Sequence, residues 1–70
     1  DIAAKEEIHN LIRRFVSIEK ERAAILISSD LSEVISESDR IAVMRYGRIV
    51  DIVPKEKATR ELILSLMLEA

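Results

Sequence analysis

The stretch RIAVMRYGRIVDIVP, residues 40–54, decides the fold of this chain. Two β-prone segments, residues 40–46 and 48–53, meet at Gly47, which is the only glycine of the sequence. A tight hairpin turn requires a residue that tolerates positive φ. Pro54 then ends the second segment, because it has no amide to donate to a continuing ladder. The stretch therefore predicts an antiparallel hairpin.

The segment before the hairpin reads as a strand followed by a short helix. Residues 23–27 form an apolar run with no polar face, as expected of a strand that is covered on both sides. Asp30 and Glu33 then have the spacing of a capping box, ahead of a helix with a narrow apolar face. A strand, a helix and another strand predict a right-handed parallel crossover. We therefore expect a small mixed sheet.

Helices are expected at both ends of the chain. Apolar side chains recur at i, i+3, i+4, i+7 and i+8, namely Ile8, Leu11, Ile12, Phe15 and Val16. This stripe, with Asp1 as N-cap, predicts an amphipathic helix over residues 2–18 with Lys5 and Arg13 facing water. Residues 59–69 predict a terminal helix that is apolar on nearly all sides and needs cover from elsewhere. The expected order is α-β-α-β-β-α in a single partial α/β domain over residues 1–70.

Composition limits the function. Seventy residues suit one small domain. A net charge of -2 and only two aromatic residues leave no basic face and no stacking platform, so we expect no nucleic-acid binding. With no cysteine, neither a disulfide nor a thiolate metal site can form. No apolar run has the length of a membrane span.

Ser28, Ser29 and Asp30 allow three interpretations. A serine nucleophile needs a base, and the only histidine, His9, is expected to be a surface residue beside the apolar stripe. A phosphate cradle would need a glycine-rich loop, which is missing. A helix cap needs only such short polar side chains before an apolar segment. Local chemistry favours the cap, with Asp30 as the capping residue.

The acidic residues after this turn suggest a metal site only weakly. Glu33 and Glu37 lie four apart on one helix face, with Asp39 following. Carboxylates at that spacing usually form a solvated surface, and no further ligand converges on them. We therefore expect no metal site in this chain.

Residues 25–50, ILISSDLSEVISESDRIAVMRYGRIV, together resemble the end of the nucleotide-binding domain of an ABC transporter ATPase, a P-loop NTPase. In that family a buried strand runs into a switch loop, then a short helix, an Asp-Arg-Ile/Val-x-Val-Met strand and a Gly-Arg-Ile-Val hairpin. The start of the chain resembles the segment that follows the second Walker motif, and its tail resembles the terminal helix of bacterial sugar-importer ATPases. The ribose, galactose and xylose type, and its second domain, is the most similar.

The resemblance implies roles for two residues. Asp1 matches the aspartate that closes the D-loop, a nucleotide-site and domain contact. Ser29 matches the switch-loop position where most members of the family have a histidine that contacts the γ-phosphate. Serine has a shorter reach and carries no imidazolium charge, so the composite site is expected to be impaired or regulatory.

The resemblance also implies what lies outside this chain. ATP and Mg²⁺ would be held by parts that precede Asp1, so we expect the 70 residues alone to be inactive. The expected partners are the remainder of the ATPase, a second nucleotide-binding domain and transmembrane permease subunits, at the inner face of the cell membrane. Because the first residue is not methionine, we expect a processed start or a piece of a longer protein. Exposed apolar faces would then favour self-association.

A rival interpretation is a stand-alone α/β module for dimerisation or ligand sensing. Fold alone does not settle function, and small α/β domains serve both purposes. This rival predicts that the terminal helix is covered by the chain's own residues.

Overall fold

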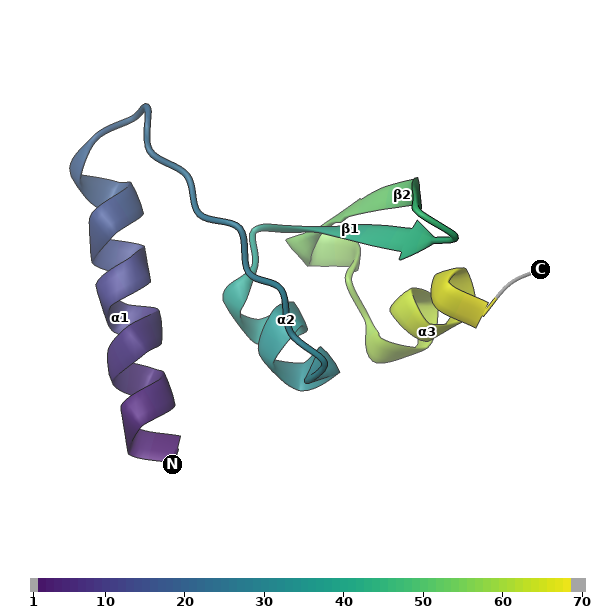
Figure 1. Cartoon of the computed structure of the whole chain (residues 1–70), viewed down its shortest axis with the longest axis horizontal. Helices are drawn as coiled ribbons and strands as arrows, with labels where there is room; N and C mark the ends of the chain where they lie inside the picture. The colour runs from purple at the N-terminus through teal and green to yellow at the C-terminus, as the bar shows by residue number, and fades with distance from the viewer. Residues whose placement is uncertain (1, 69–70) are drawn as a thin grey trace.

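The structure, a computed structural model, describes residues 2–68. In chain order its elements are α1 (Ile2–Ile18), α2 (Leu31–Glu37), β1 (Arg40–Arg45), β2 (Arg48–Pro54), a 3₁₀ turn η1 (Lys55–Lys57) and α3 (Arg60–Leu68). Helix α1 stands apart, and an extended linker joins it to α2 (Figure 1). Helices α2 and α3 lie with the hairpin in a separate body. The expected N-cap Asp1 and the expected helix end at Glu69 lie outside the described residues.

The predicted hairpin is confirmed. Strands β1 and β2 pair in antiparallel register from Arg40 opposite Pro54 to Arg45 opposite Arg48. The two turn residues, Tyr46 and Gly47, have φ of 51° and 76°. Positive φ at both positions matches the right-handed twist of the flanking strands. The sequence pointed to Gly47 alone, and Tyr46 shares the left-handed conformation.

The core of the body lies on one face of this hairpin. Ile41, Val43 and Val53 alternate toward α3, where Ile63 meets them, and all four are between 2% and 6% exposed. Partly buried apolar side chains surround them, namely Leu31, Val34, Ile35, Ala58 and Leu66. Alternation along β1 and the apolar faces of α2 and α3 thus bury one shared set of side chains.

The strand predicted at residues 23–27 is wrong for this chain. The structure has no strand there, and Ile25 and Ile27 are 89% and 90% exposed. A β-strand needs backbone hydrogen bonds to a neighbouring strand. Among residues 2–68, no strand pairs with residues 23–27. In the part of the chain that the structure describes, the sheet therefore has two antiparallel strands rather than being mixed, and there is no parallel crossover. The observed order is α-α-β-β-3₁₀-α instead of α-β-α-β-β-α.

The end helices form where predicted, but their apolar surface is largely uncovered. Helix α1 spans the predicted residues, yet Leu11 is 61% and Phe15 49% exposed. In α3 only Ile63 is buried, whereas Met67 and Leu68 are exposed. The described residues thus cover one side of α3 and little of the α1 stripe. No helix within residues 2–68 is long and apolar enough to cross a membrane.

Candidate functional site

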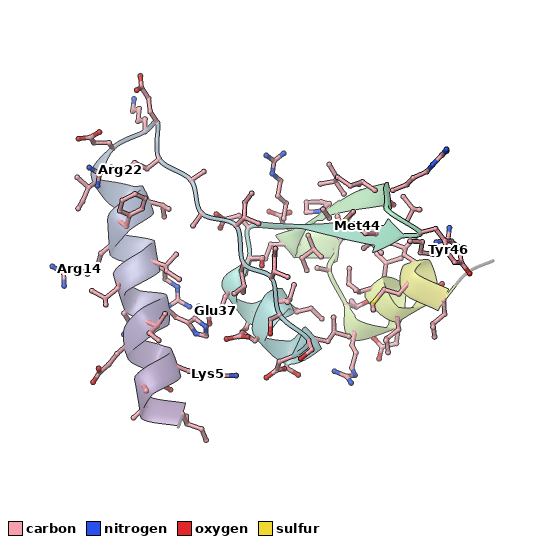
Figure 2. The ribbon with its side chains drawn as sticks, in the orientation of Figure 1. Lys5, Arg14, Arg22, Glu37, Met44 and Tyr46 are labelled. Atoms are coloured by element: carbon pink, nitrogen blue, oxygen red, sulfur yellow. The ribbon has the colours of Figure 1, made fainter. Side chains whose placement is uncertain are left out.

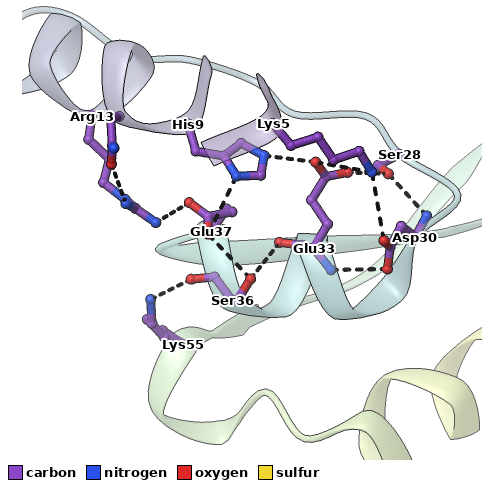
Figure 3. A network of polar contacts seen from close by, with 10 residues as sticks. Lys5, His9, Arg13, Ser28, Asp30, Glu33, Ser36, Glu37 and Lys55 are labelled. Atoms are coloured by element: carbon purple, nitrogen blue, oxygen red, sulfur yellow. Dashed lines mark hydrogen bonds and ion pairs between the residues drawn. The ribbon is translucent and has the colours of Figure 1, made fainter. Parts of the chain in front are cut away.

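Three hydrogen bonds close a ring around the turn that enters α2. The Asp30 side chain caps the helix by accepting from the Glu33 amide, with 3.2 Å between Oδ1 and N. The Asp30 amide donates to the Ser28 hydroxyl at 3.0 Å. Ser28 Oγ in turn donates to Glu33 Oε1 at 2.6 Å. Figure 3 shows this ring at the start of α2.

The ring differs from the capping box that the sequence suggested. In a capping box the glutamate side chain reaches the N-cap amide directly. Here the Ser28 hydroxyl stands between the Glu33 carboxylate and the Asp30 amide. Of the two serines, Ser28 therefore holds the turn. The sequence carried a signal for this role, because Ser28 lies two residues before a capping aspartate.

The second oxygen of Glu33 meets α1. Its Oε2 lies 2.7 Å from Nε2 of His9, whose side chain is 15% exposed. The hydrogen bond from Ser28, and then that from His9, lower the pKa of Glu33 below its ordinary value of 4.5, although burial opposes them. An ionised carboxylate only accepts hydrogen bonds. Ser28 must therefore donate its hydroxyl proton, and His9 must carry a proton on Nε2.

A row of basic side chains on α1 faces a row of acidic side chains at α2. The basic row, Lys5, His9 and Arg13, repeats every four residues, and the acidic row consists of Asp30, Glu33 and Glu37. Lys5 Nζ lies 3.9 Å from both Asp30 Oδ2 and Glu33 Oε2, and Arg13 pairs with Glu37. His9 Nδ1 lies 3.7 Å from Glu37 Oε2. Figure 3 shows the two rows facing each other.

Lys5 and Arg13 face water as predicted, with side chains 55% and 56% exposed, and they also pair with the acidic row. Glu33 and Glu37, expected to form a solvated surface, are only 12% and 17% exposed, which corrects that expectation. Spacings of three or four residues place each row on one side of its helix, and the two rows carry opposite charge. That complementarity was readable in the sequence, but nothing in the sequence showed that the two helices face each other.

Ser29, the expected catalytic position, lies outside the ring. It sits at the bend between Ser28 and Asp30, and its side chain is exposed. The structure therefore holds the backbone on both sides of Ser29 and leaves its hydroxyl open to solvent. Asp1, the other expected site residue, lies outside the described residues.

The arrangement does not support a serine nucleophile. An activated serine needs its proton accepted by a neighbouring base. His9 instead hydrogen-bonds to the Glu33 carboxylate, and the Ser28 hydroxyl donates to that same carboxylate. Among residues 2–68, no group of three His, Cys, Asp or Glu side chains is arranged to hold a metal ion.

The chain is similar to ATP-binding proteins of bacterial sugar importers. It is 47% identical over all 70 residues to the arabinose import ATP-binding protein AraG of Chromohalobacter salexigens, of which it covers 14%. It is 48% identical over 65 residues, 93% of the chain, to the ribose import ATP-binding protein RbsA 2 of Rubrobacter xylanophilus, covering 12% of that protein. A third relative, AraG 1 of Burkholderia lata, is 46% identical over 68 residues, 97% of the chain and 13% of the relative.

No protein-family model and no solved structure matches the chain. The chain spans at most 14% of the length of the three relatives above.

Proposed function

We propose that this chain, which is homologous over its whole length to ATP-binding proteins of ABC sugar importers, forms the C-terminal portion of one nucleotide-binding domain of such a protein. The observation that carries the proposal is identity of 46% to 48% across 93% to 100% of the chain. The capped turn, the short helix and the hairpin follow one another along the chain, which supports the proposal, although the strand that the resemblance places before them is absent from residues 23–27.

The complete protein would hydrolyse ATP with Mg²⁺ and couple this reaction to the uptake of a monosaccharide. Phosphoryl transfer is catalysed by positioning and electrostatic stabilisation, through a phosphate-cradling loop, a metal-binding aspartate and a water-positioning residue. The 70 residues contain no glycine-rich loop, since Gly47 is their only glycine. The chain alone is therefore proposed to be inactive, and ATP and Mg²⁺ to bind elsewhere in the domain.

Ser29 is proposed to occupy the switch-loop position that most ABC ATPases fill with histidine. Its exposed side chain at the bend supports this role, because a group that contacts a phosphate on another segment must face outward. A serine hydroxyl is shorter than an imidazole and carries no charge, so it stabilises the transition state less. The ATP site to which Ser29 contributes is thus proposed to be impaired or regulatory.

Partners follow from the surfaces left uncovered. The exposed apolar stripe of α1 and the exposed Ile25 and Ile27 suit burial against the remainder of the ATPase domain. Permease subunits and a second nucleotide-binding domain complete the proposed assembly, on the cytoplasmic face of the membrane. Detached from that cover, the chain is expected to self-associate.

The rival, a stand-alone dimerisation or ligand-sensing module, has less support. It requires the terminal helix to be covered by the chain's own residues. Leu68 is 80% and Met67 46% exposed on α3, and the α1 stripe is uncovered as well. A second copy could cover these faces, so the oligomeric state alone does not separate the two proposals, whereas ATP turnover does.

The test begins with the source gene. Its complete reading frame should encode a phosphate-cradling loop and a catalytic glutamate upstream of Asp1, and the purified product should hydrolyse ATP with Mg²⁺. Ser29→His should raise turnover, because histidine restores a charged contact to the γ-phosphate. Ser32→His, the same exchange at an exposed residue of α2, is the control and should leave turnover unchanged. Equal turnover of native protein and Ser29→His would refute the role of Ser29.

A further inference from the structure

Two side chains among the described residues of α1 contact the ring around the turn: Lys5 lies 3.9 Å from Asp30 and Glu33, and His9 makes the one hydrogen bond. His9 hydrogen-bonds to the same Glu33 carboxylate that accepts from Ser28, and Ser28 accepts from the Asp30 amide. We propose that His9 is a positioning residue, which acts through Glu33 and Ser28 to fix the turn that carries Ser29. Helix α1 and this turn then move as one unit. The importance of Ser29 for ATP turnover rests on the proposed function, whereas the hydrogen-bonded path does not.

The path has one possible direction of donation. Glu33, with its lowered pKa, is ionised near neutral pH and can only accept. The Ser28 proton therefore points to Glu33, which leaves the Ser28 oxygen free to accept from the Asp30 amide. His9 donates to the remaining Glu33 oxygen. Because each member has a fixed role, loss of the His9 proton donor weakens the hold of Glu33 on Ser28 and loosens Asp30.

The turn has few other restraints. Residues 22–28 have no regular secondary structure, and Ile25 and Ile27 point into solvent. Helix α1 contributes no buried residue that could anchor the linker from its other end. The hydrogen-bonded path thus connects the turn to the one long helix that precedes it.

His9 is the strongest link in the basic row of α1. Its Nε2 lies 2.7 Å from Glu33, and both side chains are only 12% to 15% exposed. Lys5 is 55% exposed and lies 3.9 Å from its acidic partners, and Arg13 is 56% exposed. Exposed pairs are screened by water and salt and contribute little. Figure 2 shows Lys5 at the edge of α1, reaching toward α2 from one side.

The first arm of the test follows the Asp30 amide. Its hydrogen exchange is measured by NMR in the 70-residue chain, and by mass spectrometry of peptides covering residues 28–33 in the complete protein. His9→Ala should speed exchange at Asp30 about fivefold, the effect of one lost side-chain hydrogen bond. His9→Gln keeps an N–H donor and should restore slow exchange, which separates loss of the donor from loss of the fold.

Matched serine variants test the middle of the path. Ser28→Ala should speed exchange at Asp30 and shift the ring resonances of His9, which are unambiguous because the chain has one histidine. Ser28→Thr keeps the hydroxyl and should reverse both effects. Ser32→Ala removes an exposed hydroxyl from α2, the helix that follows the turn, and should change neither. Unchanged His9 ring resonances in Ser28→Ala would refute the proposal that His9 acts through Glu33 and Ser28. Unchanged hydrogen exchange at Asp30 in His9→Ala would refute it as well.

The second arm measures ATP turnover by the complete protein. His9→Ala should lower kcat and leave the KM for ATP unchanged, and His9→Gln should recover kcat, because the positioned turn acts on turnover and not on nucleotide binding. If Ser29→His alters turnover but His9→Ala does not, the positioning role is overturned while the proposed function stands. If the complete protein hydrolyses no ATP, the proposed function fails, and the exchange measurements still decide whether His9 holds the turn.

Discussion

The body formed by residues 31–68 and the segment formed by residues 2–30 are held in place by different forces. In the body, four aliphatic side chains from the hairpin and α3 bury one another almost completely. Helix α1, despite its apolar stripe, meets α2 through charged and polar side chains and buries none of its residues. The two regions have similar fractions of apolar residues. In residues 31–68 these side chains form a buried core, whereas in residues 2–30 most of them stay exposed.

The comparison shows that an apolar stripe stabilises a structure only where a second apolar surface is available. Ile63 of α3 is 2% exposed, whereas Leu11 of α1 is 61% exposed. Both belong to helices with apolar faces, and only one of those faces meets the hairpin. Under the proposed function, the missing surface for α1 belongs to the remainder of the ATPase domain.

The largest expected effect comes from breaking the core of the body. Ile63→Ala removes a buried side chain that packs against Ile41, Val43 and Val53, and should lower the free energy of unfolding by about 2–5 kcal/mol. A core this small stabilises the fold by only a few kcal/mol, so the hairpin and α3 should unfold together. Urea denaturation followed by circular dichroism measures the change.

The matched control is Leu11→Ala on α1. Because Leu11 is 61% exposed, its truncation should change the free energy of unfolding by less than about 0.5 kcal/mol at a dilution where copies of the chain do not associate. A loss as large as that of Ile63→Ala would mean that the α1 stripe is buried in solution. The apparent stability of the native chain would then rise with protein concentration, as expected of an assembly of copies.

A smaller effect is expected at the hairpin turn. Gly47 has a φ of 76°, and nothing lies within 4 Å of the position that a Cβ would occupy. Gly47→Ala should therefore cost about 1 kcal/mol through backbone strain alone, because no clash adds to it. Gly47→Asn should cost less, since asparagine tolerates the left-handed conformation. Equal losses for the two variants in urea denaturation would refute this explanation.

The smallest effect concerns the attachment of α1 and depends on pH. The pKa of Glu33 is lowered in the folded chain, so its contribution is fully present above the ordinary value of 4.5 and is lost as pH falls through the lower folded value. The Asp30 and Glu33 amide resonances should therefore move as pH falls below 4.5, while those of the buried β1 residues Ile41 and Val43 stay in place. Glu33→Gln, which cannot ionise, should reduce the movement at both amides. Movement of both regions together would show that the body depends on this contact.

The candidate site was visible in part from the sequence. The spacing of Asp30 and Glu33 indicated a capped helix, and the resemblance drew attention to Ser29. The sequence did not show that Ser28 bridges the two capping partners, because that depends on a backbone bend. It also placed His9 as a surface residue, because its partner Glu33 lies 24 positions away in the chain.

Local periodicity determined the helices and the hairpin of this protein. The bounds of α1 follow from a stripe repeated every three to four residues, and the hairpin follows from two β-prone runs that meet at one glycine. These elements form from hydrogen bonds between residues close in sequence, so the sequence alone suffices. A strand at residues 23–27 and a cover for the α1 stripe both need a partner surface distant in the chain. Only the tertiary structure decided whether that strand forms and whether the α1 stripe is buried. Within the described residues neither finds a partner surface.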